Sequence, residues 1–147
     1  MALKDAIATL NELIETCKDG EQGFQTAADA VRDPSVKQLF LQYAQQRAQF
    51  AAELQREVSG LGGEPEQGGS VSGSLHRGWM NLKSAITGQN DASVIAAAEE
   101  GEDVARNAYG KALAAELPPD VRRVVEREYA AIKEAHDRVR ALKQRAA

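Results

Sequence analysis

The 147-residue sequence has little of several features, and each shortage excludes a class of protein. Its one cysteine, Cys17, cannot form a disulfide within the chain, which suits a reducing compartment such as the cytoplasm. Aromatic residues make up only 5%, and alanine dominates the apolar residues, a balance that favours closely packed helices over sheets. No apolar run approaches the roughly 20 residues that span a bilayer, and the first ten residues lack a signal-peptide core. We therefore expect a helical, cytoplasmic protein.

The charged residues are unevenly distributed along the chain. The net charge is −4, yet residues 119–147 hold eight Lys/Arg against five Asp/Glu. Proteins that bind nucleic acids present a denser basic patch, so no nucleic-acid partner is expected. The acidic segment 99–103, EEGED, is a ready ion-pair partner for the basic end of the chain.

Prolines and glycines divide the sequence into four long helical segments. All four prolines lie at segment boundaries, and half of the twelve glycines fall within residues 59–74. Between these breaks the apolar residues recur at helical spacing, with the 4-3-4-3 rhythm of a bundle seam. The predicted helices are 3–31, 34–59, 91–117 and 119–146.

The lengths of the connections predict how these helices are arranged. The connection between the first two helices and the connection between the last two helices are short, so each joins an antiparallel pair. The crossover 60–90, with a short helix predicted at 74–87, is long enough to return the chain along the whole bundle. The predicted fold class is therefore all-α, a single-domain (1–147) four-helix bundle with up-down-down-up topology.

The crossover contains the only tryptophan, within a short apolar stripe. One reading makes this segment a strap that packs Trp79 on the outside of the bundle. The other makes it an amphipathic surface that docks a membrane or a partner. Because the stripe is short and contains few basic residues, packing is favoured and a membrane partner is not expected. The residues concerned are Leu75, His76, Arg77, Trp79, Leu82 and Ile86.

Polar residues interrupt the apolar seams of the four helices. The interruptions are predicted to lie at one level, that is, at a similar distance from one end of the bundle. Under the up-down-down-up topology these interruptions lie about 10–13 residues from the same end of the bundle. A carboxylate that faces a bundle interior must be paired or bound to a metal ion. Glu128 lies lower and is expected to form a separate pair. The interrupting residues, with a nearby glutamine, are Glu21, Gln46, Arg47, Gln49, Glu102 and His136.

Several segments resemble a bacterial family of uncharacterised ferritin-like four-helix-bundle proteins, over essentially the whole chain. The resemblance implies a ferritin-like fold in a bacterial protein, without an established activity. Ferritin-like di-iron sites use a Glu from each of two helices and Glu-x-x-His from each of the other two. Glu21 and Glu102 match the single carboxylates, Gln46 and Gln49 replace one paired motif, and only His136 remains of the other. The segments are DGEQGF, YAQQRAQFAAEL, LHRGWMNLKSAITG, EEGEDVARNAY and IKEAHDRVRAL.

Two readings of this polar level follow. In the favoured one, Arg47 replaces the charge of the metal, no cofactor is bound, and the protein is non-enzymatic, stress-related and active through association. In the alternative, Glu21, Glu102 and His136 hold iron or another divalent metal in a ferroxidase-like protein. A homodimer is a candidate state, because long bundles often expose an apolar face.

Overall fold

The computed structural model describes residues 3–68, 76–88 and 90–146, and all regular structure in these ranges is helical. There are four long helices, α1 (Leu3–Ala30), α2 (Pro34–Gly60), α4 (Asp91–Ala114) and α5 (Pro119–Ala146), and a short one, α3 (Leu82–Thr87). The predicted all-helical class is thus confirmed for the described part of the chain. No helix in this part has an apolar stretch long enough to cross a bilayer.

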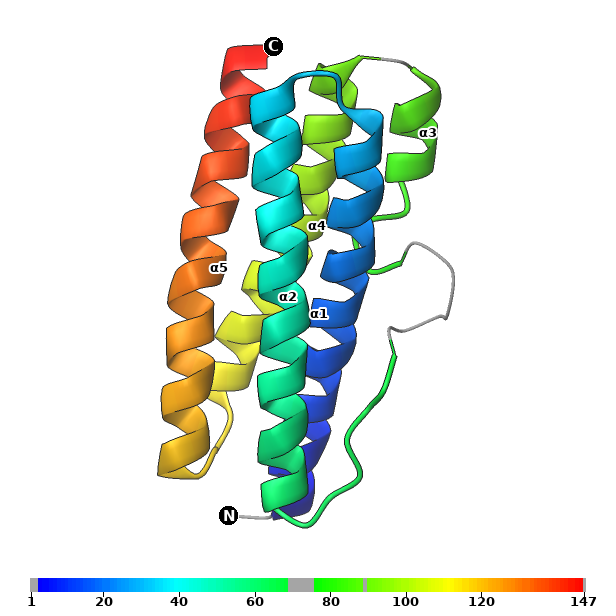
Figure 1. Cartoon of the computed structure of the whole chain (residues 1–147). Coiled ribbons are helices and arrows are strands. Elements are labelled where there is room, and N and C mark those ends of the chain that lie inside the picture. The colour runs from blue at the N-terminus through cyan, green and yellow to red at the C-terminus, as the bar shows by residue number, and fades with distance from the viewer. Residues whose placement is uncertain (1–2, 69–75, 89, 147) are drawn as a thin grey trace.

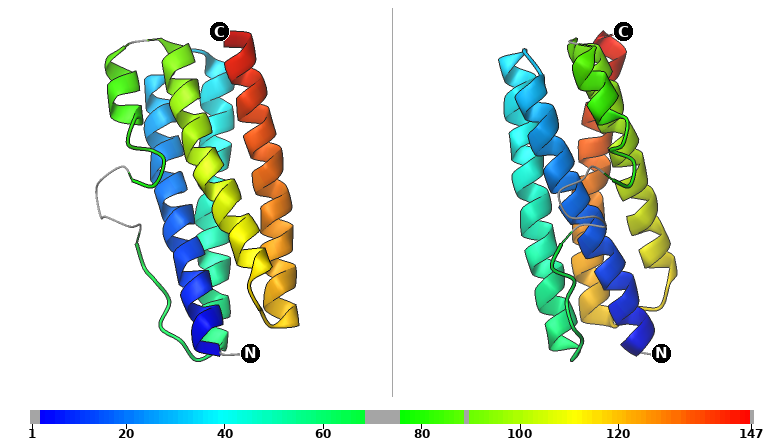
Figure 2. Two further views of the ribbon diagram at one scale, coloured as in Figure 1. Left: turned by 180° about the vertical axis from the view of Figure 1, so that it is seen from behind. Right: turned by 90° about the vertical axis from the view of Figure 1, so that its right-hand side faces the viewer.

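The long helices lie side by side in a bundle (Figure 1). α1 rises from the N-terminal end and α2 descends beside it; α4 starts at the upper end, descends, and is followed by the ascending α5. The two further views show the same order, with α3 beside the upper part of the bundle (Figure 2). α1 packs against both α2 and α4, and α4 packs against α5, whereas α2 and α5 approach each other closely at few positions.

Side-chain caps fix where α2 and α4 begin. Asp33 accepts a hydrogen bond from the backbone N–H of Ser35 at 2.8 Å and is followed by Pro34, as in a well-capped helix. The cap of α4 is Asn90, which accepts from the N–H of Ser93. Asp91 instead accepts from the N–H groups of Arg32 and Asp33, at 2.8 and 3.0 Å. This carboxylate therefore ties the start of α4 to the turn between α1 and α2.

Two of the predicted helix ranges are wrong. The crossover helix is not 74–87 but Leu82–Thr87, because Arg77 and Gly78 have φ angles of 48° and 91°, which a right-handed helix cannot contain. Residues 74 and 75 lie outside the described part. The helix predicted at 91–117 ends at Ala114, because Ala115 is extended, with φ −84° and ψ 166°. Leu117, the residue before Pro118, is also disfavoured in the helical conformation.

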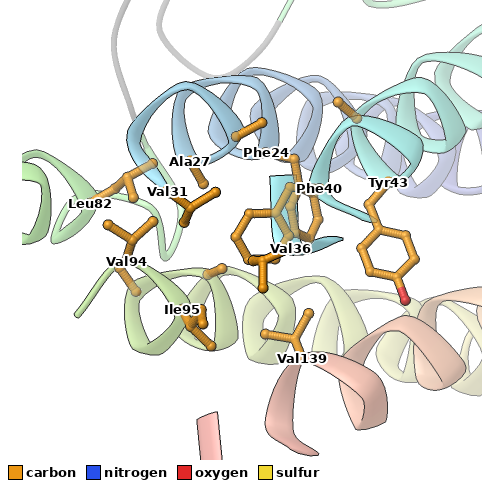
Figure 3. Close-up of a cluster of buried hydrophobic side chains, with 14 of the residues drawn as sticks. Phe24, Ala27, Val31, Val36, Phe40, Tyr43, Leu82, Val94, Ile95 and Val139 are labelled. Atoms are coloured by element: carbon orange, nitrogen blue, oxygen red, sulfur yellow. The ribbon is translucent and has the colours of Figure 1, made fainter. Parts of the chain in front are cut away.

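The apolar core consists of two clusters that follow one another along the bundle. The upper cluster includes Phe24, Phe40 and Val139 (Figure 3). Along α2, Arg47 lies between Ala44 of the upper cluster and Ala51 of the lower one. Glu102 lies likewise between Ala98 and Ala105 of α4, so buried polar residues separate the two clusters.

Candidate functional site

A buried ion pair joins α2 to α4 between the two apolar clusters. The guanidinium of Arg47 donates two hydrogen bonds to the carboxylate of Glu102, at 2.5 and 2.8 Å, and the side chains are 1% and 0% exposed. Burial works to lower the pKa of Arg47, but the charge and hydrogen bonds of Glu102 raise it above its ordinary value. The guanidinium is therefore charged, and it compensates the carboxylate inside the bundle.

The neighbouring helices provide the space that the long Arg47 side chain needs. At Gly20 of α1, an added Cβ would lie 3.4 Å from Nη1 and 3.5 Å from Cγ of Arg47. The guanidinium lies over the ring of Phe24, with 5.3 Å between its carbon and the ring centroid. Nε donates to Gln46 Oε1 at 3.3 Å. Residues of α1, α2 and α4 thus fix the position of the charge.

A second buried polar group links all four long helices. Tyr109 of α4 donates from its hydroxyl to Glu128 Oε1 of α5 at 2.7 Å, and the same hydroxyl lies 3.1 Å from Cys17 Sγ of α1. Glu53 of α2 interacts with the Glu128 carboxyl and accepts a hydrogen bond from Arg127. We refer to Cys17, Glu53, Tyr109 and Glu128 as the Tyr109 cluster.

The groups of the Tyr109 cluster keep their protons at neutral pH, with the exception of Glu53. Burial, together with the neighbouring Glu53, raises the pKa of Glu128 to about 10. The interaction with Glu128 lowers the pKa of Glu53, so Glu53 is ionised and the proton stays on Glu128. Burial also raises the pKa of Cys17 to about 12 and that of Tyr109 well above its ordinary value. Cys17 is therefore a thiol and not a nucleophilic thiolate.

The sequence pattern identified only part of this second group. Cys17 and Tyr109 count as apolar seam positions in a hydrophobic pattern, and Glu53 reads as one more charge on the surface of a helix. The available signal was Glu128, a carboxylate on the apolar stripe of its helix. Such a group requires a donor from a neighbouring seam, and tyrosine is the seam residue that carries one.

Glu21 does not join the buried ion pair, so its predicted convergence with Arg47 is wrong. Its side chain is 27% exposed and lies 3.8 Å from Lys18. The seam of α1 passes through Gly20 at this level, and one residue further the helix has turned by about 100°. The acidic side chain therefore lies at the rim of the bundle.

Gln49 and His136 also lie away from the ion pair. Gln49 is exposed and, with the half-buried Gln46, lines a surface groove. His136 is 2% exposed, and its Nε2 lies 2.6 Å from Asp103 Oδ1 on the α4–α5 side of the bundle. In the described ranges no three His, Cys, Asp or Glu side chains lie close enough together to hold a metal ion. The predicted set of Glu21, Glu102 and His136 does not come together.

Trp79 of the crossover packs between α1 and α4. It is 2% exposed, and an added Cβ at either Gly23 or Gly101 would lie 2.2 Å from its ring. Its ring meets that of Phe24 edge-on, with 4.9 Å between centroids. The two glycines therefore form a slot for the indole, and this burial favours packing over partner docking.

Polar contacts hold the residues around Trp79 against the same two helices. Arg77 lies 3.2 Å from Glu15 and 3.7 Å from Asp19 of α1, and Asn81 donates to Glu100 of α4 at 2.7 Å. His76 is half-buried, Leu82 is buried, and Ile86 packs on the upper cluster. Leu75 lies outside the described residues.

A match to a protein-family model identifies the family of the chain. Residues 5–115 match the model of the family described as a domain of unknown function, DUF2383. The chain belongs to this family. The DUF2383 match contains the Arg47–Glu102 pair and Trp79 with its glycine slot, and it ends before α5, which carries Glu128 and His136. No curated protein gives a significant match to the chain.

Proposed function

We propose that this DUF2383 protein is a non-enzymatic bacterial bundle protein that acts by associating with other protein chains. In this proposal its single domain has the ferritin-like arrangement, and an ion pair replaces the metal centre. The observation that carries the proposal is the guanidinium of Arg47, which occupies both oxygens of the buried Glu102 carboxylate. The course of the helices supports the arrangement, since α4 begins at the end of the bundle where α1 ends.

The charge balance inside the bundle explains why the site does not suit a metal ion. Metal ligands must be deprotonated and free to donate an electron pair. Glu102 is already neutralised by Arg47, and Glu128 holds its proton. Glu21, which the family pattern would supply from α1, lies at the rim beside Lys18. A divalent cation at this level would have to displace a buried guanidinium, so the donor set does not fit a di-iron centre.

The protonation states of the Tyr109 cluster support the absence of catalysis by these residues. Cys17, Tyr109 and Glu128 are buried and protonated, so none of them is ready to act as a nucleophile or a general base. Their hydrogen bonds instead connect α1, α4 and α5. We assign them to the stability of the fold.

Metal analysis tests this proposal. The protein, purified without chelator, is examined by elemental analysis and then titrated with Fe²⁺ under anaerobic conditions or with Zn²⁺ while its melting temperature is followed. We expect no stoichiometric metal and an unchanged melting temperature. Stoichiometric binding that is lost in Glu102→Ala, but retained when the exposed Glu126 of α5 is changed to Ala, would overturn the proposal and establish a metal-binding function.

A further inference from the structure

The outward face of α2 is free of charge over four helical turns. Between Lys37 and Glu53 the only charged residue of α2 is Arg47, which is buried. Leu41 is 40% exposed and is one of three large apolar side chains exposed in the described ranges. By contrast, α5 exposes mainly charged residues. Depletion of charge marks the core of a protein–protein interface. The exposed residues of this face are Gln38, Leu41, Gln42, Gln45 and Gln49.

A groove runs beside this face, because α2 and α5 approach each other closely at few positions. It consists of two hollows of about 550 and 410 Å³ that share Gln42 in their lining. Leu39, Phe50 and Leu142 supply apolar surface within it. Its charged lining residues are Arg127, Arg138 and Arg145 of α5, and no carboxylate lines either hollow. In Figure 1 this side is bounded by α5 and α2. The groove and the uncharged face together form a strip that runs from Ser35 to Phe50 on α2 and from Arg127 to Arg145 on α5.

The border of the groove on α5 carries two opposite charges one helical turn apart, Glu134 and Arg138. Arg138 lines the larger hollow, and Glu134 lies four residues before it, on the same side of α5. Both side chains are exposed, and neither is paired with another described residue. When two copies of α5 face each other in opposite directions, the negative charge of one copy can face the positive charge of the other.

We propose that this α2–α5 face is the contact between two copies of the chain, related by a twofold axis that crosses it near Gln42. The proposal rests on the proposed function and specifies the association. In a twofold interface residues near the axis meet their own copies, so a charge there would repel itself. Glutamine both donates and accepts hydrogen bonds and pairs with itself. With α2 antiparallel to its copy, Glu134 of one protomer meets Arg138 of the other.

The size of the strip agrees with a stable dimer. A standard interface buries about 800 Å² on each partner. The accessible surface of the chain is 7612 Å², so such a contact would cover roughly a tenth of it. The lined parts of α2, Ser35 to Phe50, and of α5, Arg127 to Arg145, are each roughly 25 Å long, and the uncharged outward face of α2 adds to this surface.

Analytical ultracentrifugation of the full chain from about 1 to 200 μM tests this contact. We expect a dimer in the unaltered chain and a dissociation constant at least tenfold larger in Gln42→Lys, which adds two like charges at the axis to a surface already lined by Arg127 and Arg138. Asn107→Lys, on the exposed side of α4, is the matched control and should leave the dimer intact. Circular dichroism verifies that all variants keep their helical content.

A charge exchange distinguishes this face from any other dimer contact. Glu134→Arg and Arg138→Glu should each weaken the dimer, and the double variant should restore it. A chain that stays monomeric over the whole range would overturn the proposal. So would a dimer that Gln42→Lys leaves unchanged, or one that the double variant fails to restore. Metal content is measured on the same preparations. A monomer without bound metal would therefore contradict only the dimer, and a dimer with bound metal would contradict only the metal-free core.

Discussion

At the residue scale, the properties of arginine explain how a charge is tolerated inside this bundle. A buried carboxylate without a partner is expensive, and a buried pair is tolerated only when its geometry is good. The planar guanidinium of Arg47 matches both oxygens of Glu102, which the single ammonium of a lysine cannot do. Gly20 supplies the room beside it. The residue type is therefore required, whereas a Cβ at position 20 would meet Arg47 at an ordinary contact distance.

Glu128 makes the stability of the protein depend on pH. Below about pH 4.5 the folded and unfolded states both hold this proton; above it the unfolded chain releases the proton, whereas the folded chain keeps it until about pH 10. The free energy of unfolding therefore falls as pH rises through this window, by at most about 1.4 kcal/mol per pH unit from this group.

Glu128→Gln should remove most of that pH dependence and make the protein more stable at pH 8. The amide can still accept from Tyr109 and donate to Glu53, without the cost of retaining a proton. Urea denaturation at pH 5, 6.5 and 8 measures the effect in both proteins. An identical decline of stability with pH in the two proteins would show that Glu128 does not hold the proton.

At the scale of the elements, the crossover is fixed to the bundle by the glycine slot around Trp79. Gly101→Ala places a methyl group where the indole lies, so Trp79 must move outward. We expect destabilisation of about 3 kcal/mol, similar to the loss of a packed tryptophan, and a red shift of the fluorescence from the only tryptophan.

Gly110→Ala on the same helix is the matched control for this change. Its added Cβ would meet only the Tyr129 hydroxyl at 3.6 Å, an ordinary contact. Alanine favours the helix by about 1 kcal/mol over glycine, so this variant should be slightly more stable and its emission unchanged. Equal effects of the two substitutions would refute the slot.

The sequence predicted the long elements well and the site only in part, for identifiable reasons. Apolar spacing together with the cap at Asp33 is enough to locate helices, because both signals are local. The short helix was predicted too long because nothing in the pattern shows a positive φ at Arg77, which is not a glycine. Glu21 was misplaced because a heptad rhythm and a 3.6-residue helix drift apart, and Gly20 took the inward position.

At the scale of the whole molecule, core contacts between all four long helices predict cooperative unfolding of one domain. Trp79 reports on the upper part of the bundle, and far-ultraviolet circular dichroism reports on every helix. We expect their urea transitions to coincide, because all four long helices contribute side chains to both the upper and the lower cluster of the core. A fluorescence transition at clearly lower urea would instead show that the crossover side unfolds separately.

The central claim, that the buried positive charge of Arg47 stabilises Glu102 in place of a metal ion, is tested most directly by a double-mutant cycle. The free energy of unfolding is measured for the unaltered chain, Arg47→Met, Glu102→Gln and the double variant at one pH without metal. Arg47→Met should cost about 3–5 kcal/mol, because it leaves a carboxylate buried and unpaired. The double variant should recover part of this loss, with a coupling free energy of at least about 2 kcal/mol. Additive effects of the two substitutions would contradict the account.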